Sequence, residues 1–121
     1  MVGFGKGEST TSTGTDEGEH WITMSPRGPG ATHVILIRHG QSENNVIESE
    51  FGDTTDFYAR RCPDPKLSAL GHQQAFLVGE RLGSQLKPAA EAGCVRILCS
   101  TMMRAMQTAA PLAHRLQVRC I

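Results

Sequence analysis

The sequence predicts an α/β fold with a mostly parallel sheet. Two short apolar runs, at 33–37 and 95–99, lack polar alternation, which is typical of strands covered on both faces. Helical periodicity follows both runs, and a third apolar run begins at Val118. The order strand, helix, strand, helix, strand favours parallel neighbours joined by crossover helices.

The first thirty residues differ in composition from the rest of the chain. Residues 1–30 are rich in Gly, Ser, Thr and acidic side chains, and almost no apolar residue recurs at a helical or strand period. This composition predicts a disordered tail that ends in a turn near Pro29 and Gly30. The predicted organisation is therefore a tail over 1–30 and one domain over 31–121.

Polar residues follow the first predicted strand directly. Arg38, His39 and Gly40 sit at its carboxyl end, where open α/β sheets bind their ligands. Residues 46–65 carry Gly and Pro without a clear period, which predicts a long irregular connection with one helical turn.

Two longer helices are predicted after that connection. Ser68 is expected to cap a helix from Ala69 to about Leu86, which Pro88 stops. Ser100 is expected to cap the next helix, which Pro111 would kink or restart. The apolar stripe expected on that helix consists of Met102, Met106, Ala109, Ala113 and Leu116.

Charge and cysteine content exclude several classes of protein. Lys plus Arg and Asp plus Glu each number 12, without a basic run, so no nucleic-acid or acidic-membrane partner is expected. No stretch is long and apolar enough for a membrane span, and no secretory signal is seen, which favours a cytoplasmic protein. The four cysteines lack metal-site spacing, and Cys94 and Cys99 are expected to be buried in a reducing compartment.

The Arg-His-Gly sequence at the strand end carries the candidate chemistry. A guanidinium such as Arg38 can hold two phosphate oxygens, a neutral imidazole such as His39 can attack phosphorus, and Gly40 lets the backbone approach an anion. Asn45 and Arg104 are placed to reach the same point. Two arginines converging on one point repel each other, so their convergence indicates an anion between them.

Three segments in order resemble motifs of the histidine phosphatase superfamily, the phosphoglycerate mutase-like proteins. Residues 38–45, RHGQSENN, resemble the signature RHGxSxxN. Residues 64–75, DPKLSALGHQQA, are similar to DxxLTxxGxxQA, and residues 100–109, STMMRAMQTA, are similar to SPxxRAxQTA. The resemblance covers residues 34 to about 116.

This resemblance implies a fold, a site and a reaction. The fold is a three-layer sandwich with a mostly parallel sheet, of which this chain holds the N-terminal portion. His39 is expected to carry a phosphoryl group, and Arg38, Asn45 and Arg104 to bind it, without a metal or organic cofactor. The expected partner is a phosphorylated small molecule or phosphoprotein; the oligomeric state is left open.

Two departures from the family pattern bear on activity. The family completes its pocket with a later His-Gly motif and an acidic residue, and neither follows residue 109 here. The chain is therefore expected to be incomplete or a degenerate copy, and enzyme and non-catalytic phospholigand-binding module both remain open. Residues 46–65 replace a compact mutase segment, which favours a phosphatase over a glycolytic mutase.

Overall fold

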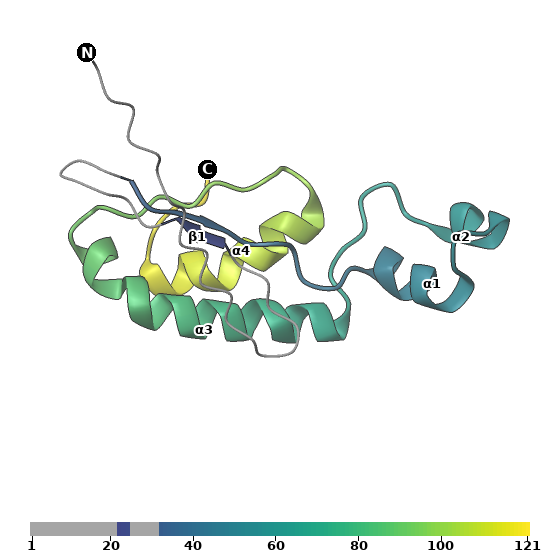
Figure 1. Cartoon of the computed structure of the whole chain (residues 1–121), viewed down its shortest axis with the longest axis horizontal. Helices are drawn as coiled ribbons and strands as arrows, with labels where there is room; N and C mark the ends of the chain where they lie inside the picture. The colour runs from purple at the N-terminus through teal and green to yellow at the C-terminus, as the bar shows by residue number, and fades with distance from the viewer. Residues whose placement is uncertain (1–21, 25–31) are drawn as a thin grey trace, which may run out of the picture. The chain divides into compact units, whose positions relative to one another are not determined.

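The computed structural model describes residues 22–24 and 32–121 and divides the chain into two units, residues 1–38 and 39–121 (Figure 1). Four helices, all in the second unit, make up most of the regular structure among the described residues.

The first unit holds an antiparallel strand pair. β1 (Ile22–Met24) pairs with β2 (Val34–Leu36), with Thr23 opposite Ile35. β2 confirms the strand predicted at 33–37, but its Val34 and Leu36 are 48% and 59% exposed, so the expected coverage of both faces is wrong. β1 lies in the segment predicted as a disordered tail; the rest of 1–30 is outside the described residues, and the boundary at residue 30 stays a prediction.

The predicted mostly parallel sheet of a three-layer sandwich is not seen in the described part of the chain. The one ladder there, β1 with β2, is antiparallel. The two strands of this ladder are near in sequence, so pairing them costs less chain entropy than closing the longer loop of a parallel crossover. A parallel bridge does join Ile97 to Cys120, with the Ile121 N–H donating to the Ile97 carbonyl at 2.9 Å. The predicted direction of this pairing is confirmed, but a single bridge makes no ladder.

Two helices replace the irregular connection predicted over 46–65. α1 (Glu43–Phe51) begins with a capping box, in which Ser42 and Asn45 each bond the other's backbone N–H. α2 (Thr55–Arg60) begins at Thr54, whose hydroxyl accepts the Phe57 N–H. These two caps satisfy N–H groups that the first turns leave unpaired. The prediction of one helical turn was therefore wrong.

Helix α3 (Ala69–Glu91) begins where predicted and ends later than predicted. The Ser68 hydroxyl accepts the Gly71 N–H, which confirms Ser68 as the N-cap. Pro88 does not stop the helix, because it lies near the end and removes only one backbone donor. A left-handed Gly93 then lets the Cys94 N–H bond the Ala89 carbonyl at 2.8 Å, which closes the last turn.

Helix α4 (Met103–Leu116) begins three residues after the predicted cap. Its N-cap is Met102, which makes no side-chain bond, and Asp64 instead accepts the Met103 N–H at 2.9 Å. A carboxylate at this position also favours the positive end of the helix dipole. Pro111 lies inside the helix without dividing it. The predicted cap at Ser100 was wrong because the capping group lies 39 residues away.

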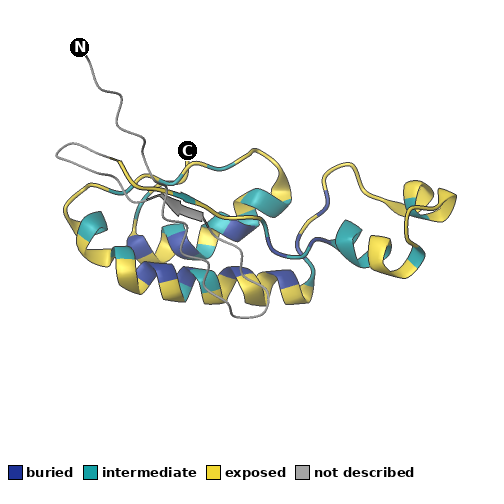
Figure 2. Cartoon of the chain, viewed as in Figure 1, coloured by how far each residue is buried: buried dark blue, intermediate teal, exposed yellow. Residues whose placement is uncertain are grey.

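The core of the second unit lies between α3 and α4 (Figure 2). Close packing is possible because Gly79 faces Pro111: a Cβ on this glycine would lie 2.9 Å from the proline Cβ. Of the apolar stripe predicted on α4, Leu116 is buried, but the methionine part is wrong, since Met102 and Met106 are 46% and 41% exposed. The buried residues of α4 instead recur at every fourth position. The buried apolar side chains are Leu67, Ala75, Leu82, Leu112 and Leu116.

The cysteines are not the buried residues that the sequence predicted. Cys94 is exposed and Cys99 is half-buried, and all four cysteines are free thiols. The Cys120 thiol donates to Cys99 Sγ at 3.1 Å. Partial burial, followed by this hydrogen bond, raises the pKa of Cys120 to about 11.

We expect iodoacetamide to alkylate Cys120 about tenfold more slowly at pH 8 than it alkylates N-acetylcysteine amide. A raised pKa lowers the thiolate fraction about 100-fold, and the higher nucleophilicity of a more basic thiolate restores about tenfold. Mass spectrometry of tryptic peptides would give the rate. A Cys120 rate equal to that of the free thiol would contradict this assignment.

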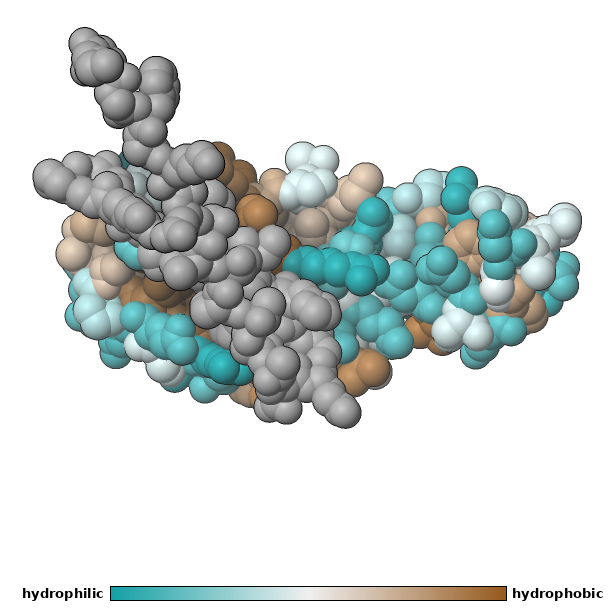
Figure 3. Space-filling model, in the orientation of Figure 1, coloured by the Kyte–Doolittle hydropathy of each residue, from teal (hydrophilic) through white to brown (hydrophobic). Residues whose placement is uncertain are grey.

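No helix in the described ranges is both long and apolar enough to cross a membrane. Figure 3 shows mostly hydrophilic colours over α1 and α2.

Candidate functional site

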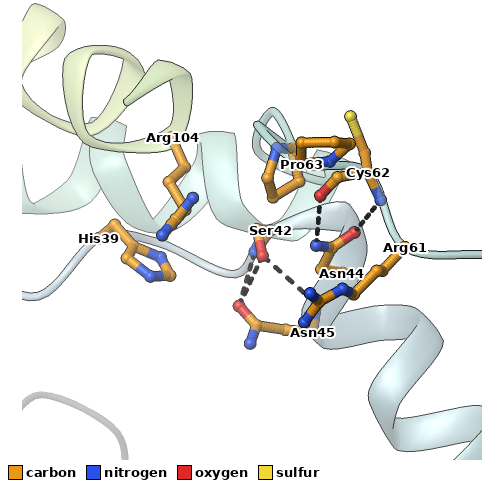
Figure 4. Close-up of a pocket in the computed structure, with 9 residues that line it drawn as sticks. His39, Ser42, Asn44, Asn45, Arg61, Cys62, Pro63 and Arg104 are labelled. Atoms are coloured by element: carbon orange, nitrogen blue, oxygen red, sulfur yellow. Dashed lines mark hydrogen bonds between the residues drawn. The ribbon is translucent and has the colours of Figure 1, made fainter. Parts of the chain in front are cut away.

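A surface pocket in the second unit collects residues from three parts of the sequence (Figure 4). The first is the segment from His39 to Asn45, the second is the 61–65 segment after α2, and the third is Arg104 in the first turn of α4. The lining residues are His39, Ser42, Asn44, Asn45, Arg61, Cys62, Pro63, Pro65 and Arg104.

Backbone contacts fix the chain next to His39. The buried Gly40 N–H donates to Thr108 Oγ1 at 3.0 Å, and the Thr108 hydroxyl donates to the Arg104 carbonyl at 2.7 Å. A Cβ on Gly40 would lie 2.6 Å from the Gly71 carbonyl oxygen, so only glycine fits here. These contacts tie the His39 backbone to α4 and hold it against the first turn of α3.

The next residue, Gln41, is bonded to the start of α3 on both sides of its backbone. Its N–H donates to Gln74 Oε1 at 2.8 Å, and its carbonyl accepts the Ser68 N–H at 2.9 Å. A Cβ on Gly71 would overlap the Gln41 carbonyl oxygen. The close approach of Gly71 therefore sets the depth at which the 39–42 segment lies on α3.

The Thr108→Val variant is expected to lose about 1–3 kcal/mol of unfolding free energy. Valine keeps the shape of the side chain but leaves the buried Gly40 N–H without its acceptor. Urea unfolding would measure the loss. The matched change at the exposed Thr101 should alter stability by less than about 0.5 kcal/mol, and equal effects at both threonines would contradict the argument.

One hydrogen bond defines which nitrogen of His39 carries its proton. Nδ1 lies 2.7 Å from the Gly40 carbonyl oxygen, and a carbonyl only accepts, so Nδ1 is the protonated nitrogen of the neutral ring. Nε2 then has a free lone pair, and it bonds no group among the described residues. The half-buried ring is thus arranged as a nucleophile at the pocket.

Asn45 combines a structural bond with a free donor. Its Oδ1 accepts from the Ser42 N–H at 3.0 Å and from the Ser42 hydroxyl at 2.9 Å. These bonds orient the amide, and its Nδ2 donates to no group in the described part of the chain. An amide held in this way presents two N–H groups to a ligand in the pocket.

The Asn45→Asp variant is expected to bind inorganic phosphate at least about tenfold more weakly. Aspartate keeps an oxygen for the Ser42 bonds but replaces the N–H donors with negative charge. Isothermal titration calorimetry would give the affinity, and thermal unfolding would show whether the cap is kept. Unchanged phosphate affinity in a folded variant would contradict the assignment of Asn45 as a ligand.

Two cations face the pocket, and one of them was not predicted as a site residue. Arg104 was predicted, and Arg61 comes from the segment after α2. No ion pair of either guanidinium is found among the described residues, and none of the lining residues is a carboxylate. The exposed Arg61 guanidinium lies 5.2 Å from the centroid of the Tyr58 ring. The pocket is therefore suited to an anion.

Three of the four predicted site residues meet at this pocket. His39, Asn45 and Arg104 all line it, and their roles in catalysis stay predictions. Arg38 is exposed and is the last residue of the first unit, so its role as a phosphate ligand also stays a prediction.

Other motif residues bind the backbone of the segments that carry the site residues. Gln107 Oε1 accepts the Leu67 N–H at 2.7 Å, and Gln74 and Thr108 hold Gln41 and Gly40 as described above. Asp64 caps α4 next to Arg104. The sequence predicted these residues as motif positions only, without a role.

The described residues contain no group of three or more His, Cys, Asp or Glu side chains that could hold a metal ion.

A family model described as the histidine phosphatase superfamily (branch 1) matches residues 34–121. Comparisons with curated proteins and with solved structures gave no significant match.

Proposed function

The chain belongs to the histidine phosphatase superfamily, which carries out phosphoryl transfer, and we propose that it hydrolyses phosphomonoesters through a phosphohistidine at His39. One observation carries this proposal. Nδ1 of His39 lies 2.7 Å from the Gly40 carbonyl oxygen, so the neutral ring carries its lone pair on Nε2, at a pocket that also holds Arg104 and the amide donors of Asn45.

The proposed reaction has two steps. Nε2 of His39 attacks phosphorus, the bond from phosphorus to the ester oxygen breaks, and the leaving alkoxide takes up a proton from solvent water. Water then attacks the phosphohistidine, the bond from phosphorus to Nε2 breaks, and inorganic phosphate leaves. Arg104, Asn45 and Arg38 would stabilise the charge that spreads over the phosphoryl oxygens.

Hydrolysis rather than mutase chemistry is favoured by the segment that borders the pocket. Three exposed residues of this segment line the pocket, namely Arg61, Cys62 and Pro63. Water can therefore reach the phosphohistidine in the second step. A mutase must return the phosphoryl group to a bound intermediate, which requires that water be excluded.

A non-catalytic phospholigand-binding module is the second candidate. It is favoured by the lining of the pocket, which holds cations and amides but, among the described residues, no carboxylate that could protonate a leaving oxygen. A missing general acid costs about 10²- to 10⁴-fold in rate. Such a site would still bind the ligand.

Trapping the phosphoenzyme would separate the two candidates. The chain is incubated with ³²P-labelled p-nitrophenyl phosphate, quenched in alkali, and analysed by mass spectrometry for acid-labile, alkali-stable phosphate on His39. Label at His39 with release of p-nitrophenol is the expected result. Phosphate binding without label would favour the binding module, and neither label nor binding would overturn the proposal.

A further inference from the structure

Arg61 lies at a different part of the pocket from Arg104 and His39. Figure 4 shows Arg104 beside His39, and Arg61 on the far side of Ser42 from both. Arg61 also comes from the chain after α2, in the segment that was predicted to be an irregular connection. The pocket therefore has two separate cationic ends.

A pair of hydrogen bonds fixes the backbone that carries Arg61. Asn44 Oδ1 accepts the Cys62 N–H at 2.9 Å, and Asn44 Nδ2 donates to the Cys62 carbonyl at 2.8 Å. Two antiparallel bonds from one planar amide restrain both the position and the orientation of the peptide. Asn44 is the neighbour of Asn45 in α1, so this clamp sets Arg61 relative to the phosphoryl-binding end.

The guanidinium of Arg61 is held without being neutralised. The Arg61 backbone N–H closes α2 by donating to the Phe57 carbonyl at 3.0 Å. The Arg61 guanidinium lies 5.2 Å from the Tyr58 ring centroid. The ring face attracts the cation but leaves the N–H fork free for an acceptor. No carboxylate among the described residues pairs with it.

We propose that Arg61 is a substrate-specificity residue, which binds a second anionic group, a carboxylate or a phosphate, on the substrate whose phosphoryl group lies at His39. This inference rests on the proposed phosphoryl site and adds a substrate class to it: phosphomonoesters with a second negative charge. Asn44 is the positioning residue, since it acts through the Cys62 backbone rather than by touching the substrate.

Binding of phosphonates tests this assignment without requiring turnover. Isothermal titration calorimetry would compare phenylphosphonate with its 3- and 4-carboxy derivatives and with the neutral 4-carbamoyl derivative. A hydrogen bond to a charged group leads us to expect about tenfold tighter binding of one carboxy derivative than of the carbamoyl compound. Benzene-1,3- and 1,4-diphosphonate would show whether a phosphate is preferred to a carboxylate.

Arg61→Gln should remove the carboxylate preference, so that it weakens binding of the preferred carboxy derivative about tenfold more than binding of phenylphosphonate. Arg60→Gln is the matched control, because it removes the same charge from a side chain that packs on Phe51, 4.7 Å from the ring centroid, and does not line the pocket. Asn44→Ala should lose the preference as Arg61→Gln does. Its binding of phenylphosphonate should stay intact, which a general loss of structure would not allow.

Two results would overturn the inference while leaving the proposed function standing. The first is a wild-type chain that binds phenylphosphonate without preferring either the carboxy derivatives or the diphosphonates. The second is an Arg61→Gln variant that weakens all the ligands equally, which would assign Arg61 to the phosphoryl group itself. If phenylphosphonate does not bind at all, the proposed phosphoryl site fails, and this inference fails with it.

Discussion

The His39→Asn variant is expected to form no phosphoenzyme and to hydrolyse p-nitrophenyl phosphate about 10⁴-fold or more slowly. Asparagine removes the Nε2 lone pair, which is the nucleophile of the first step of the proposed reaction. Its amide nitrogen can still donate to the Gly40 carbonyl, as Nδ1 of His39 does at 2.7 Å. The variant therefore tests the nucleophile rather than the shape of the strand end.

The measurement is acid-labile ³²P incorporation together with release of p-nitrophenol. His114→Asn is the matched control, since His114 is an exposed residue near the end of α4 that lines no part of the pocket. It should keep the activity of the wild type. Label that persists in His39→Asn would assign the phosphoryl group to another residue and remove the basis of the proposed mechanism.

Two elements that the sequence predicted have limits that depend on neighbouring residues, although α1 and α2 also begin at local caps and were missed. Ser68 caps α3 through Gly71, three residues later, and β2 is a short β-branched run, so both were predictable. The start of α4 was not, because its cap is Asp64, 39 residues earlier in the chain. The partner of β2 was also not predictable, since β1 lies in a segment whose composition favours disorder.

The same distinction holds for the site. His39, Asn45 and Arg104 were predicted because each lies within a motif, and all three line the pocket. Arg61 was missed because its position depends on the clamp between Asn44 and Cys62, which are 18 residues apart. The sequence alone does not show that the bonds of Asn44 to the Cys62 backbone place Arg61, rather than the adjacent Arg60, at the pocket.

The Gly71→Ala variant is expected to lose about 2 kcal/mol or more of unfolding free energy. Alanine in a helix gains up to about 1 kcal/mol over glycine. At this position the added Cβ would overlap the Gln41 carbonyl oxygen and lie 2.9 Å from the Gln41 carbonyl carbon. Overpacking costs about 1–3 kcal/mol, and occasionally more, and this contact belongs at the upper end, because neither the Cβ nor the backbone atoms that it meets can rotate away. The clash therefore outweighs the gain in propensity.

Gly83→Ala is the matched control for this argument, because it adds the same Cβ to the same helix at another buried glycine. The atoms it would meet belong to the Arg115 side chain, which is flexible and can move. Moving it breaks an exposed ion pair with Glu80, 2.6 Å long, which is worth less than about 1 kcal/mol and is offset by the helical propensity of alanine. Urea unfolding should therefore separate the two variants by about 2 kcal/mol. Equal destabilisation would mean that α3 tolerates no added side chain on this face, and that the Gly71 contact does not specifically fix the 39–42 segment.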